Sequence, residues 1–341
     1  MSAPAAFDRY RSAVTAEMRQ VLAQWGSLLN PMMGYHLGWL EQDGTESSAP
    51  AGKALRPALC LLSCESLGGA VDRAVPAAAA VELVHNFSLI HDDIQDDDLT
   101  RRHRPTVWSI WGKPQAINAG TAMRILASLA LSRLAGRGVP DDVQLLLRQI
   151  LDEASLRLID GQFLDISYEE RLDVTVDEYM AMIRSKTAVL IACAAEFGAL
   201  LAGADDSTRR HFHDFGMDLG LAFQIRDDIL GVWGDQSLTG KPLGSDIRHR
   251  KKTFPLVYAL AHAGGSDRDN LAKLYRSHTV DEDGVKSVMT VLDAVAARQK
   301  AQELAEDYCE RAVQNLADTA LPPSGKTDLE EVARFLVSRD F

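Results

Sequence analysis

The chain has 341 residues, of which 46% are hydrophobic and 25% are charged, a composition typical of globular proteins. Its 36 basic and 48 acidic residues give a formal net charge of −12, which argues against a general nucleic-acid-binding protein. Because the N-terminus lacks a basic-then-apolar leader and no apolar run reaches about 18 residues, we expect a cytoplasmic protein without a membrane span.

Apolar residues recur with the helix period in almost every segment. Helices are predicted over residues 7–29, 53–68, 76–98, 113–136, 141–168, 176–203, 207–233, 253–264, 297–317 and 327–338. No window alternates as an exposed strand does. The stretches VPAAAAVELVHNFSLIHDD and TAVLIACAAEFGALLAGA are apolar nearly all round, so other helices must enclose them. We therefore predict an all-α fold, a single large helical bundle spanning 1–341, with 40–51 as a polar mobile loop.

The stretch LIHDDIQDDDLTRR, residues 89–102, concentrates acidic side chains at the end of one predicted helix. In a helix over 76–98, Asp92 and Asp96 lie one turn apart on one face, close to the stripe of His85. Two carboxylates at this spacing repel each other unless a positive charge lies between them. Mg²⁺ binds a few carboxylate oxygens and completes its shell with phosphate and water. A solvated acidic helix end explains this motif equally well when it is taken alone.

A second acidic pair, Asp227 and Asp228, lies late in another apolar helix, in FQIRDDILGVWGD. Metal sites in helical bundles are built from side chains on facing helices. Two such pairs therefore suggest two acidic clusters that face each other at the mouth of one cavity.

Basic residues occur where an anionic substrate would need them. They are Lys53, Arg56, Arg101, Arg102, Lys186, Lys241 and Lys251. Lys and Arg bind diphosphate strongly, and Arg does so through two parallel donors. A surface charge is the alternative for each of them. Lys186 is the exception, because a cation midway along an apolar helix is costly unless it is paired.

These motifs, in this order from about residue 50 to the C-terminus, resemble those of the trans-isoprenyl diphosphate synthases, the polyprenyl synthetase family. The resemblance implies an all-helical bundle around a deep central cavity, and a homodimer. It also implies a Mg²⁺-dependent prenyltransferase that condenses isopentenyl diphosphate with an allylic diphosphate such as dimethylallyl, geranyl or farnesyl diphosphate. The allylic diphosphate ionises, the alkene attacks, and a proton is lost to the departing diphosphate, so no protein nucleophile is required.

The resemblance also assigns roles to individual residues. Asp92 and Asp96 would hold two Mg²⁺ ions and Asp227 a third. The allylic diphosphate would contact Arg101, Lys186 and Lys241, with Lys251 nearby. Isopentenyl diphosphate would be held by Lys53, Arg56, His85 and Arg102. Thr187 and Gln224 would line the allylic chain near the reacting carbon, and Gln162 and Asp165 would line the same pocket. We also expect the C-terminal segment to close over the site, with Arg339 near phosphate.

Two positions depart from the family pattern. Gly231 stands at the last position of the second motif, where the family usually has Asp. We expect a weaker third metal site rather than an inactive enzyme. Asp235, one turn further along, is either a partial substitute or a loop cap. Thr121 follows Gly120 where many relatives have Gly-Asp, and nothing in the sequence explains that change.

Product length depends on the two positions that precede Asp92 by five and four residues, Phe87 and Ser88. In the family these positions help to set the floor of the hydrophobic tunnel. One helix turn rises about 5.4 Å, so a bulky side chain there stops growth after a few isoprene units. The layout resembles that of archaeal-type geranylgeranyl synthases and predicts a C20 product. A C15 farnesyl product, a product of C25 or longer, and a role for Phe87 in core packing alone stay open.

Two other functions are compatible with the same fold. A terpene cyclase would ionise a finished diphosphate and close rings, but it would not need the complete isopentenyl diphosphate site. A non-catalytic partner subunit typically lacks an aspartate motif, whereas Asp92, Asp96 and Asp227 are all present. The sequence therefore favours the prenyltransferase.

Overall fold

The computed structural model describes residues 6–47, 54–235, 242–277, 280–317, 319 and 321–339. Two predicted site residues, Lys53 and Lys241, lie outside these residues, as does part of the predicted loop 40–51. The described part of that loop is a polar turn, closed by a bridge between Leu40 and Glu46.

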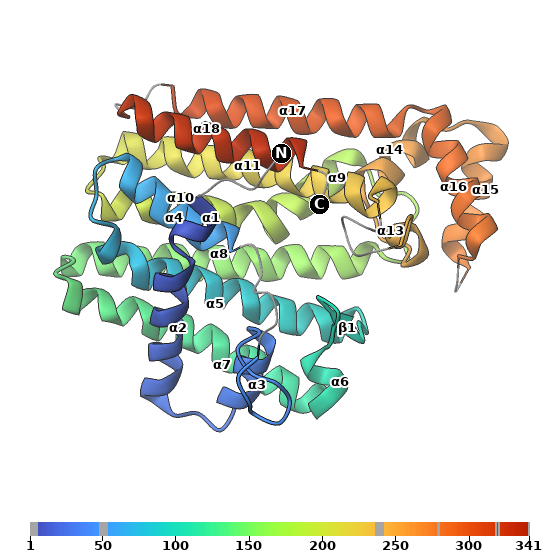
Figure 1. Cartoon of the computed structure of the whole chain (residues 1–341). Helices are drawn as coiled ribbons and strands as arrows, with labels where there is room; N and C mark the ends of the chain where they lie inside the picture. Colours follow the sequence, from blue (N-terminus) through green and yellow to red (C-terminus); the bar gives the residue numbers. More distant parts are fainter. Residues whose placement is uncertain are drawn as a thin grey trace.

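Helices make up nearly all of the regular structure in the described residues, so the all-α prediction is confirmed (Figure 1). In chain order they are α1 (Ala6–Arg9), α2 (Arg11–Trp25), α3 (Asn30–His36), α4 (Leu55–Ser66), α5 (Val71–Gln95), α6 (Val107–Trp111), α7 (Lys113–Ser132), η1 (Arg133–Arg137), α8 (Asp141–Tyr168), α9 (Val176–Ile183), η2 (Arg184–Ala188), α10 (Val189–Leu201), α11 (Asp206–Trp233), α13 (Ser245–Arg248), α14 (Phe254–His262), α15 (Gly265–Arg276), α16 (Glu282–Ala294), α17 (Ala297–Asn315) and α18 (Pro323–Ser338).

Helix α10 lies in the interior of the bundle, and its side chains from Leu190 to Ala199 are buried. It packs against α4, α5, α8 and α11, while α7 covers α5 and α17 covers α11. In Figure 1 these long helices lie side by side as successive layers. A helix that is apolar on every side is stable in water only when neighbours cover it. The enclosure predicted from the sequence for this helix is therefore observed.

The predicted helix over 176–203 is interrupted by one π-helical turn, η2, between α9 and α10. This turn packs closely against α8 at Gly161, where an added Cβ would lie 2.2 Å from the backbone nitrogen of Lys186. Only a residue without a side chain allows this approach. Single π-turns inside α-helices occur frequently at functional sites, and this one carries Lys186 and Thr187.

A small hairpin follows α5 and was not predicted. Strand β1 (Thr100–Arg101) pairs with β2 (Arg104–Pro105), and the two turn residues, Arg102 and His103, both have positive φ angles of 52° and 62°. Two-residue hairpin turns need this backbone conformation and favour Asn or Gly. The Arg-His turn lacks that sequence signal, so the sequence pattern does not predict the hairpin.

The sequence pattern also does not predict two helices in the C-terminal third of the chain, α15 and α16. In α15 only Leu271 and Tyr275 are buried, so this short and very polar helix offers few apolar residues from which a period can be recognised. Helix α16 buries Val285, Val288 and Val291 on one face, but β-branched residues lower intrinsic helix propensity. Both helices pack against α14 and against each other. They are therefore stabilised by tertiary contacts more than by local sequence.

No helix among the described residues is sufficiently long and apolar to span a bilayer.

Candidate active site

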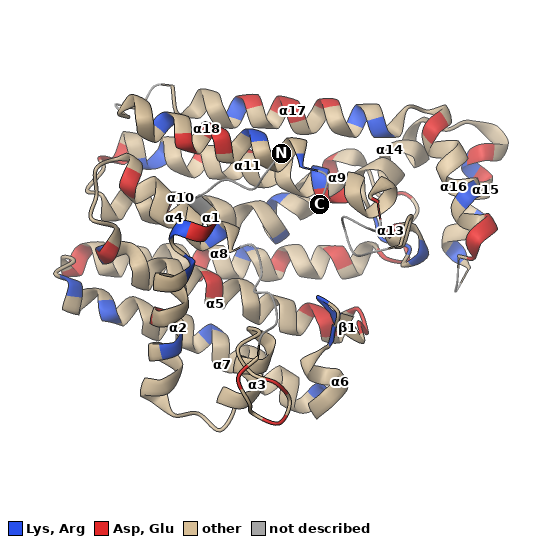
Figure 2. Cartoon of the chain, in the orientation of Figure 1, with Lys and Arg blue, Asp and Glu red and all other residues tan. Residues whose placement is uncertain are grey.

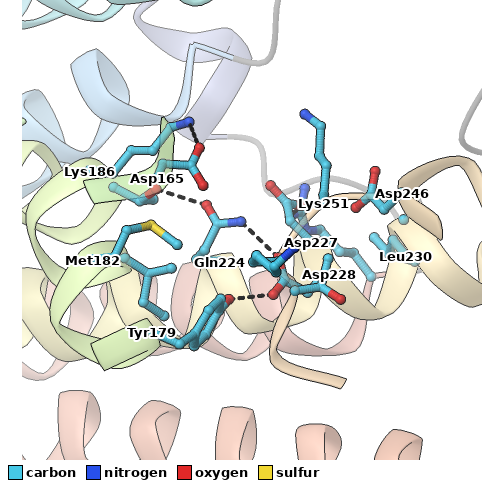
Figure 3. Close-up of a pocket in the computed structure, with 16 residues that line it drawn as sticks. Asp165, Tyr179, Met182, Lys186, Gln224, Asp227, Asp228, Leu230, Asp246 and Lys251 are labelled. Atoms are coloured by element: carbon cyan, nitrogen blue, oxygen red, sulfur yellow. Dashed lines mark hydrogen bonds and ion pairs between the residues drawn. The ribbon is translucent and has the colours of Figure 1, made fainter. Parts of the chain in front are cut away.

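Two adjoining cavities open beside the C-terminal part of α5 and the C-terminal half of α11. The polar cavity, of about 450 Å³, is lined mainly by charged and hydrogen-bonding side chains (Figure 3). The apolar cavity, of about 760 Å³, extends between α5, α7 and α8. The two share Lys186, Thr187, Gln224 and Asp227. Asp92 and Asp227 both line the apolar cavity, so the two acidic motifs meet at one hollow.

Cations of the chain itself neutralise the first acidic motif. The Nζ atom of Lys186 lies 3.2 Å from Asp92 and also contacts Asp165, while Arg101 lies 3.7 Å from Asp92. The Nζ atom of Lys251 lies 3.6 Å from Asp96. Figure 2 shows the resulting mixture of acidic and basic residues beside β1, where α5 ends. Every carboxylate that the sequence proposed for Mg²⁺ in this motif therefore has a cationic partner.

This pairing changes the protonation of the two aspartates in opposite directions. Burial works to raise the pKa of Asp92, but Lys186, Lys251 and Arg101 outweigh it and leave that pKa below its ordinary value. Burial and the neighbouring charge of Asp92 raise the pKa of Asp96. Two carboxylates so close together hold their charges only with positive charge nearby, which is the environment that a divalent cation would provide.

The donor set fits Mg²⁺ and not a cation that needs a complete protein cage. In the described ranges no group of three or more His, Cys, Asp or Glu side chains is arranged to hold a metal alone. Mg²⁺ is commonly bound through one or two carboxylates, with substrate phosphates and water completing its shell. Asp92, Asp96 and Asp227 could supply such carboxylates, and Lys186, Lys251 and Arg101 could meet the phosphates.

Asp227 of the second acidic motif forms an ion pair with Arg339, which lies near the C-terminus. Arg339, only 4% exposed, directs its guanidinium onto the carboxylate of Asp227 and lies over the ring of Phe223 at 4.5 Å. Its carbonyl oxygen accepts hydrogen bonds from Arg226 at 2.9 and 2.6 Å. The C-terminal segment thus reaches the site, as predicted, and its cation pairs with a proposed metal ligand.

Gly231 leaves space that another carboxylate fills. A Cβ at this position would lie 1.9 Å from Oδ2 of Asp246. Asp246 lines the polar cavity beside Asp227 (Figure 3). Asp235, the substitute suggested by the sequence, is exposed and lines neither cavity. The carboxylate nearest the vacated position comes from Asp246 on α13, in the sequence GSDI, which pattern reading alone did not single out. A part for Asp235 in the third metal site stays a prediction.

A hydrogen-bonded chain fixes the amide of Gln224. Its Oε1 accepts from the hydroxyl of Thr187 at 2.8 Å, and its Nε2 donates to Asp228 at 3.0 Å. Asp228 also accepts from the Tyr179 hydroxyl (Figure 3) and, at 2.7 Å, from the backbone N–H of Phe254. Burial raises the pKa of Asp228 to about 7 although all three donors oppose this. Asp228 is therefore saturated with internal partners, unlike its neighbour Asp227.

Three basic side chains, Arg56, His85 and Arg102, line the other wall of the apolar cavity. The carboxylate of Glu82 acts electrostatically on both arginines, but no ion pair within 4 Å joins it to either of them among the described residues. Burial lowers the pKa of His85 well below its ordinary value, and Arg56 and Arg102 lower it further. The buried Nε atom of Arg56 has no hydrogen-bond partner among the described residues. A buried donor without a partner is costly. An anion bound here would relieve both the like-charge repulsion and the missing hydrogen bond.

Comparison with known proteins agrees with this arrangement. The model of the polyprenyl synthetase family matches residues 38–292. The chain belongs to the polyprenyl synthetase family. It is 40% identical to the (2E,6E)-farnesyl diphosphate synthase of Mycobacterium tuberculosis, over 96% of this chain and 90% of that protein. It is 37% identical to a geranylgeranyl diphosphate synthase of the same organism, over 98% and 94% of the two chains. A solved polyprenyl synthetase from Streptomyces coelicolor A3(2) superposes with a TM-score of 0.90, at 38% identity over 97% and 98% of the two chains.

As a polyprenyl synthetase the protein is a prenyltransferase, and its family acts on small isoprenoid diphosphates. Most residues proposed from the sequence line the two cavities. The apolar cavity includes Arg56, His85, Phe87, Ser88, Asp92, Arg101, Arg102, Gln162, Lys186, Thr187, Gln224 and Asp227. Asp165, Lys251 and Arg339 line the polar cavity, and Asp96 reaches the site through Lys251.

The ion pair between Arg339 and Asp227 predicts that loss of the Arg339 charge makes Asp227 a better Mg²⁺ ligand. In Arg339→Met the apolar stem over Phe223 is kept and the charge is lost. We expect the metal-free variant to lose about 1 kcal/mol of unfolding free energy, since Asp227 is 39% exposed and partly solvated. Added Mg²⁺ should raise its melting temperature more than that of the unaltered protein, because Asp227 is free to bind. Arg334→Met, an exposed change on α18, the helix that precedes Arg339, is the control. An equal Mg²⁺ response in all three proteins would contradict the interpretation.

Proposed function

We propose that the protein condenses isopentenyl diphosphate head-to-tail with an allylic diphosphate in a Mg²⁺-dependent reaction. The allylic substrate is dimethylallyl, geranyl or farnesyl diphosphate. The observation that supports this best is the shared hollow: two carboxylate motifs and their cations lie at the mouth of a long apolar cavity. Such a site can hold a charged diphosphate at one end and an isoprenoid chain at the other.

The first step is the ionisation of the allylic diphosphate. When bound, three Mg²⁺ ions on Asp92, Asp96 and Asp227 would stabilise the negative charge of the leaving group. Arg101 and Lys186 leave their carboxylate partners for the diphosphate oxygens, and Lys241 and Lys251 assist. Fixed cations in a site that excludes water lower the barrier because they require little rearrangement as charge develops. The carbon–oxygen bond then breaks to give an allylic cation.

The cation must survive until the alkene attacks. The Oε1 atom of Gln224 and the hydroxyl of Thr187 lie at the junction of the two cavities. Their oxygen dipoles stabilise positive charge on the reacting carbon. The walls of the apolar cavity, including Phe223 and Gln162, limit access of water to it. The proton lost after the attack goes to the departing diphosphate, so no side chain is needed as a base.

Isopentenyl diphosphate binds without metal in this proposal. Arg56, His85 and Arg102, together with Lys53, supply donors for its diphosphate. His85 is neutral at physiological pH because of its lowered pKa, and it acts as a hydrogen-bond donor. The unpartnered Nε of Arg56 is one donor that the ligand would satisfy.

For the product we propose C20 geranylgeranyl diphosphate. Phe87 is 5% exposed and lines the apolar cavity with Ser88, so its ring narrows the space available to the growing chain. C15 farnesyl diphosphate is the alternative, supported by the farnesyl diphosphate synthase that is 40% identical to this chain. Relatives of both names match over nearly the whole chain, and their similarity does not separate the two lengths.

The direct test is incubation of the purified protein with Mg²⁺, isopentenyl diphosphate and each allylic primer in turn, followed by sizing of the products. We expect linear all-trans diphosphates that incorporate isopentenyl diphosphate, and none when EDTA removes the metal. A cyclic hydrocarbon formed without isopentenyl diphosphate would show a cyclase instead, and no product with any primer would favour a non-catalytic subunit.

Removal of one proposed metal ligand should affect turnover strongly. In Asp92→Ala we expect turnover to fall at least ~100-fold, the scale of losing one group that stabilises the transition state. Steady-state kinetics with dimethylallyl diphosphate would measure this. Asp97→Ala, an exposed change in the same acidic run, is the control. A near-normal rate in Asp92→Ala would remove this residue from the metal site.

The ring of Phe87 should limit product length. In Phe87→Ala we expect the main product to lengthen by at least one isoprene unit, because about one helix turn of depth, roughly 5.4 Å, is opened. Phe87→Leu, which removes less volume, should give a smaller shift, and thermal melts would show whether both variants stay folded. An unchanged product from folded Phe87→Ala would assign the ring to core packing alone.

We further propose a homodimer formed through α7 and α8. These helices expose large apolar side chains that line neither cavity, including Ile117 and Ile125 on α7 and Leu145 and Leu156 on α8. Exposed large apolar side chains on neighbouring helices are typical of a protein–protein interface when they form a patch. Sedimentation equilibrium should give twice the chain mass, and Leu145→Lys should shift the mass toward that of the monomer. A monomeric unaltered protein at micromolar concentration would contradict the proposal.

A further inference from the structure

The depth of the apolar cavity follows from the register of α7 against α5. The Nε2 atom of His91 lies 3.3 Å from the carbonyl oxygen of Ile117, and an added Cβ at Gly120 would lie 3.4 Å from the carbonyl oxygen of Phe87. Rising numbers on α7 therefore correspond to falling numbers on α5, away from Asp92. Since a helix rises about 1.5 Å per residue, Arg124 lies roughly 6 Å deeper than Gly120. It is the deepest residue of α7 that lines the cavity.

Arg124 places a charged side chain at this end of the cavity, where the first lining residues of α8, Leu158 and Ile159, are apolar. Its guanidinium is held on two sides: Nη1 donates to the hydroxyl of Ser128 at 2.9 Å, and Nη2 pairs with Asp152 on α8. Its side chain is 19% exposed and that of Asp152 is 65% exposed. The pair thus bridges the two helices, which lie side by side in Figure 1. Asp152 is the solvent-exposed partner, and Arg124 is the partner that lines the cavity.

Packed core lies beyond this bridge. Ala127 and Leu151 are fully buried, and neither of them lines the cavity. An isoprenoid chain that reached Arg124 would therefore have to displace the guanidinium to continue. Displacement would separate the guanidinium from Asp152 and leave it against hydrocarbon, where an unpaired charge is strongly unfavourable.

We propose that Arg124, held by Asp152, closes the deep end of the apolar cavity and, together with Phe87, sets the longest product chain. This inference rests on the proposed function and adds a second specificity-determining residue to it. Arg124 acts on chain length only, because it lies far from the diphosphate groups and touches no reacting atom.

The test compares product lengths made by Arg124→Ala, Arg124→Lys and Asp152→Ala with radiolabelled isopentenyl diphosphate and dimethylallyl diphosphate. Arg148→Ala is the matched control. Arg148 on α8 also reaches α7, through a 2.9 Å bond to Ser132, but it does not line the cavity. In Arg124→Ala we expect the ratio of the next longer product to the main product to rise on the order of tenfold. A tenfold change corresponds to a difference of about 1.4 kcal/mol in free energy. Arg124→Lys should largely keep the original ratio, because it keeps the charge.

Asp152→Ala provides the test if Arg124→Ala does not fold. Since Asp152 is mostly exposed, its removal leaves the core unchanged, while the guanidinium keeps only Ser128 as a partner. We expect a smaller rise in the longer product than in Arg124→Ala, and no rise in Arg148→Ala. The KM for isopentenyl diphosphate should stay the same in all variants.

A product spectrum in folded Arg124→Ala or in Asp152→Ala identical to that of the unaltered protein would overturn the inference. Failure of the proposed function is a different result, since the unaltered protein would then incorporate no isopentenyl diphosphate.

Discussion

The structure depends on the neutralisation of carboxylates that two helices bring to one buried place. Asp92 at the end of α5 and Asp227 on α11 line the same cavity. Without positive charge between them, burial and mutual repulsion would favour protonation of such groups or separation of the helices. The chain supplies that charge from three distant segments, through Lys186 on the π-turn, Arg101 on the hairpin and Arg339 near the C-terminus.

The same cations suit the proposed reaction. In the free protein these lysine and arginine side chains pair with carboxylates. When a divalent cation binds the carboxylate instead, the side chain can pair with a diphosphate oxygen. The site would then exchange one set of charge pairs for another, and little reorganisation would be needed at the moment of bond breaking. The internal network of Thr187, Gln224, Asp228 and Tyr179 takes no part in this exchange. It holds one amide in a fixed orientation while the ionic contacts around it change.

The residues proposed for the reaction and the residues proposed to set product length lie at different ends of the site. The diphosphate end of the site is built from the ends of α5, η2 and α11, whereas the hydrocarbon end lies between α5, α7 and α8. In our proposal, a change at Phe87 or Arg124 would alter the volume open to the chain. It would leave the ionic contacts of Asp92, Asp96 and Asp227 in place. This division gives a physical reason why relatives named for farnesyl and for geranylgeranyl diphosphate match this chain almost equally well.

The sequence by itself determined the helical fold and the composition of the candidate site. Helical periodicity and two aspartate motifs depend on neighbours a few residues apart, and such local patterns are visible in one dimension. The hairpin with Arg102 and His103 at its turn, and α15 with only two buried residues, lacked that local signal, and contacts with other elements stabilise them.

Only the tertiary structure decided which distant charges meet. Asp246 occupies the space above Gly231, Arg339 reaches Asp227, and Arg124 pairs with Asp152 across two helices. Each of these contacts joins residues on different elements, and their spacing along the chain carries no periodic signal. The packing of the bundle determines which side chains come within a few ångströms, and the strength of an ionic contact depends on that distance and on burial.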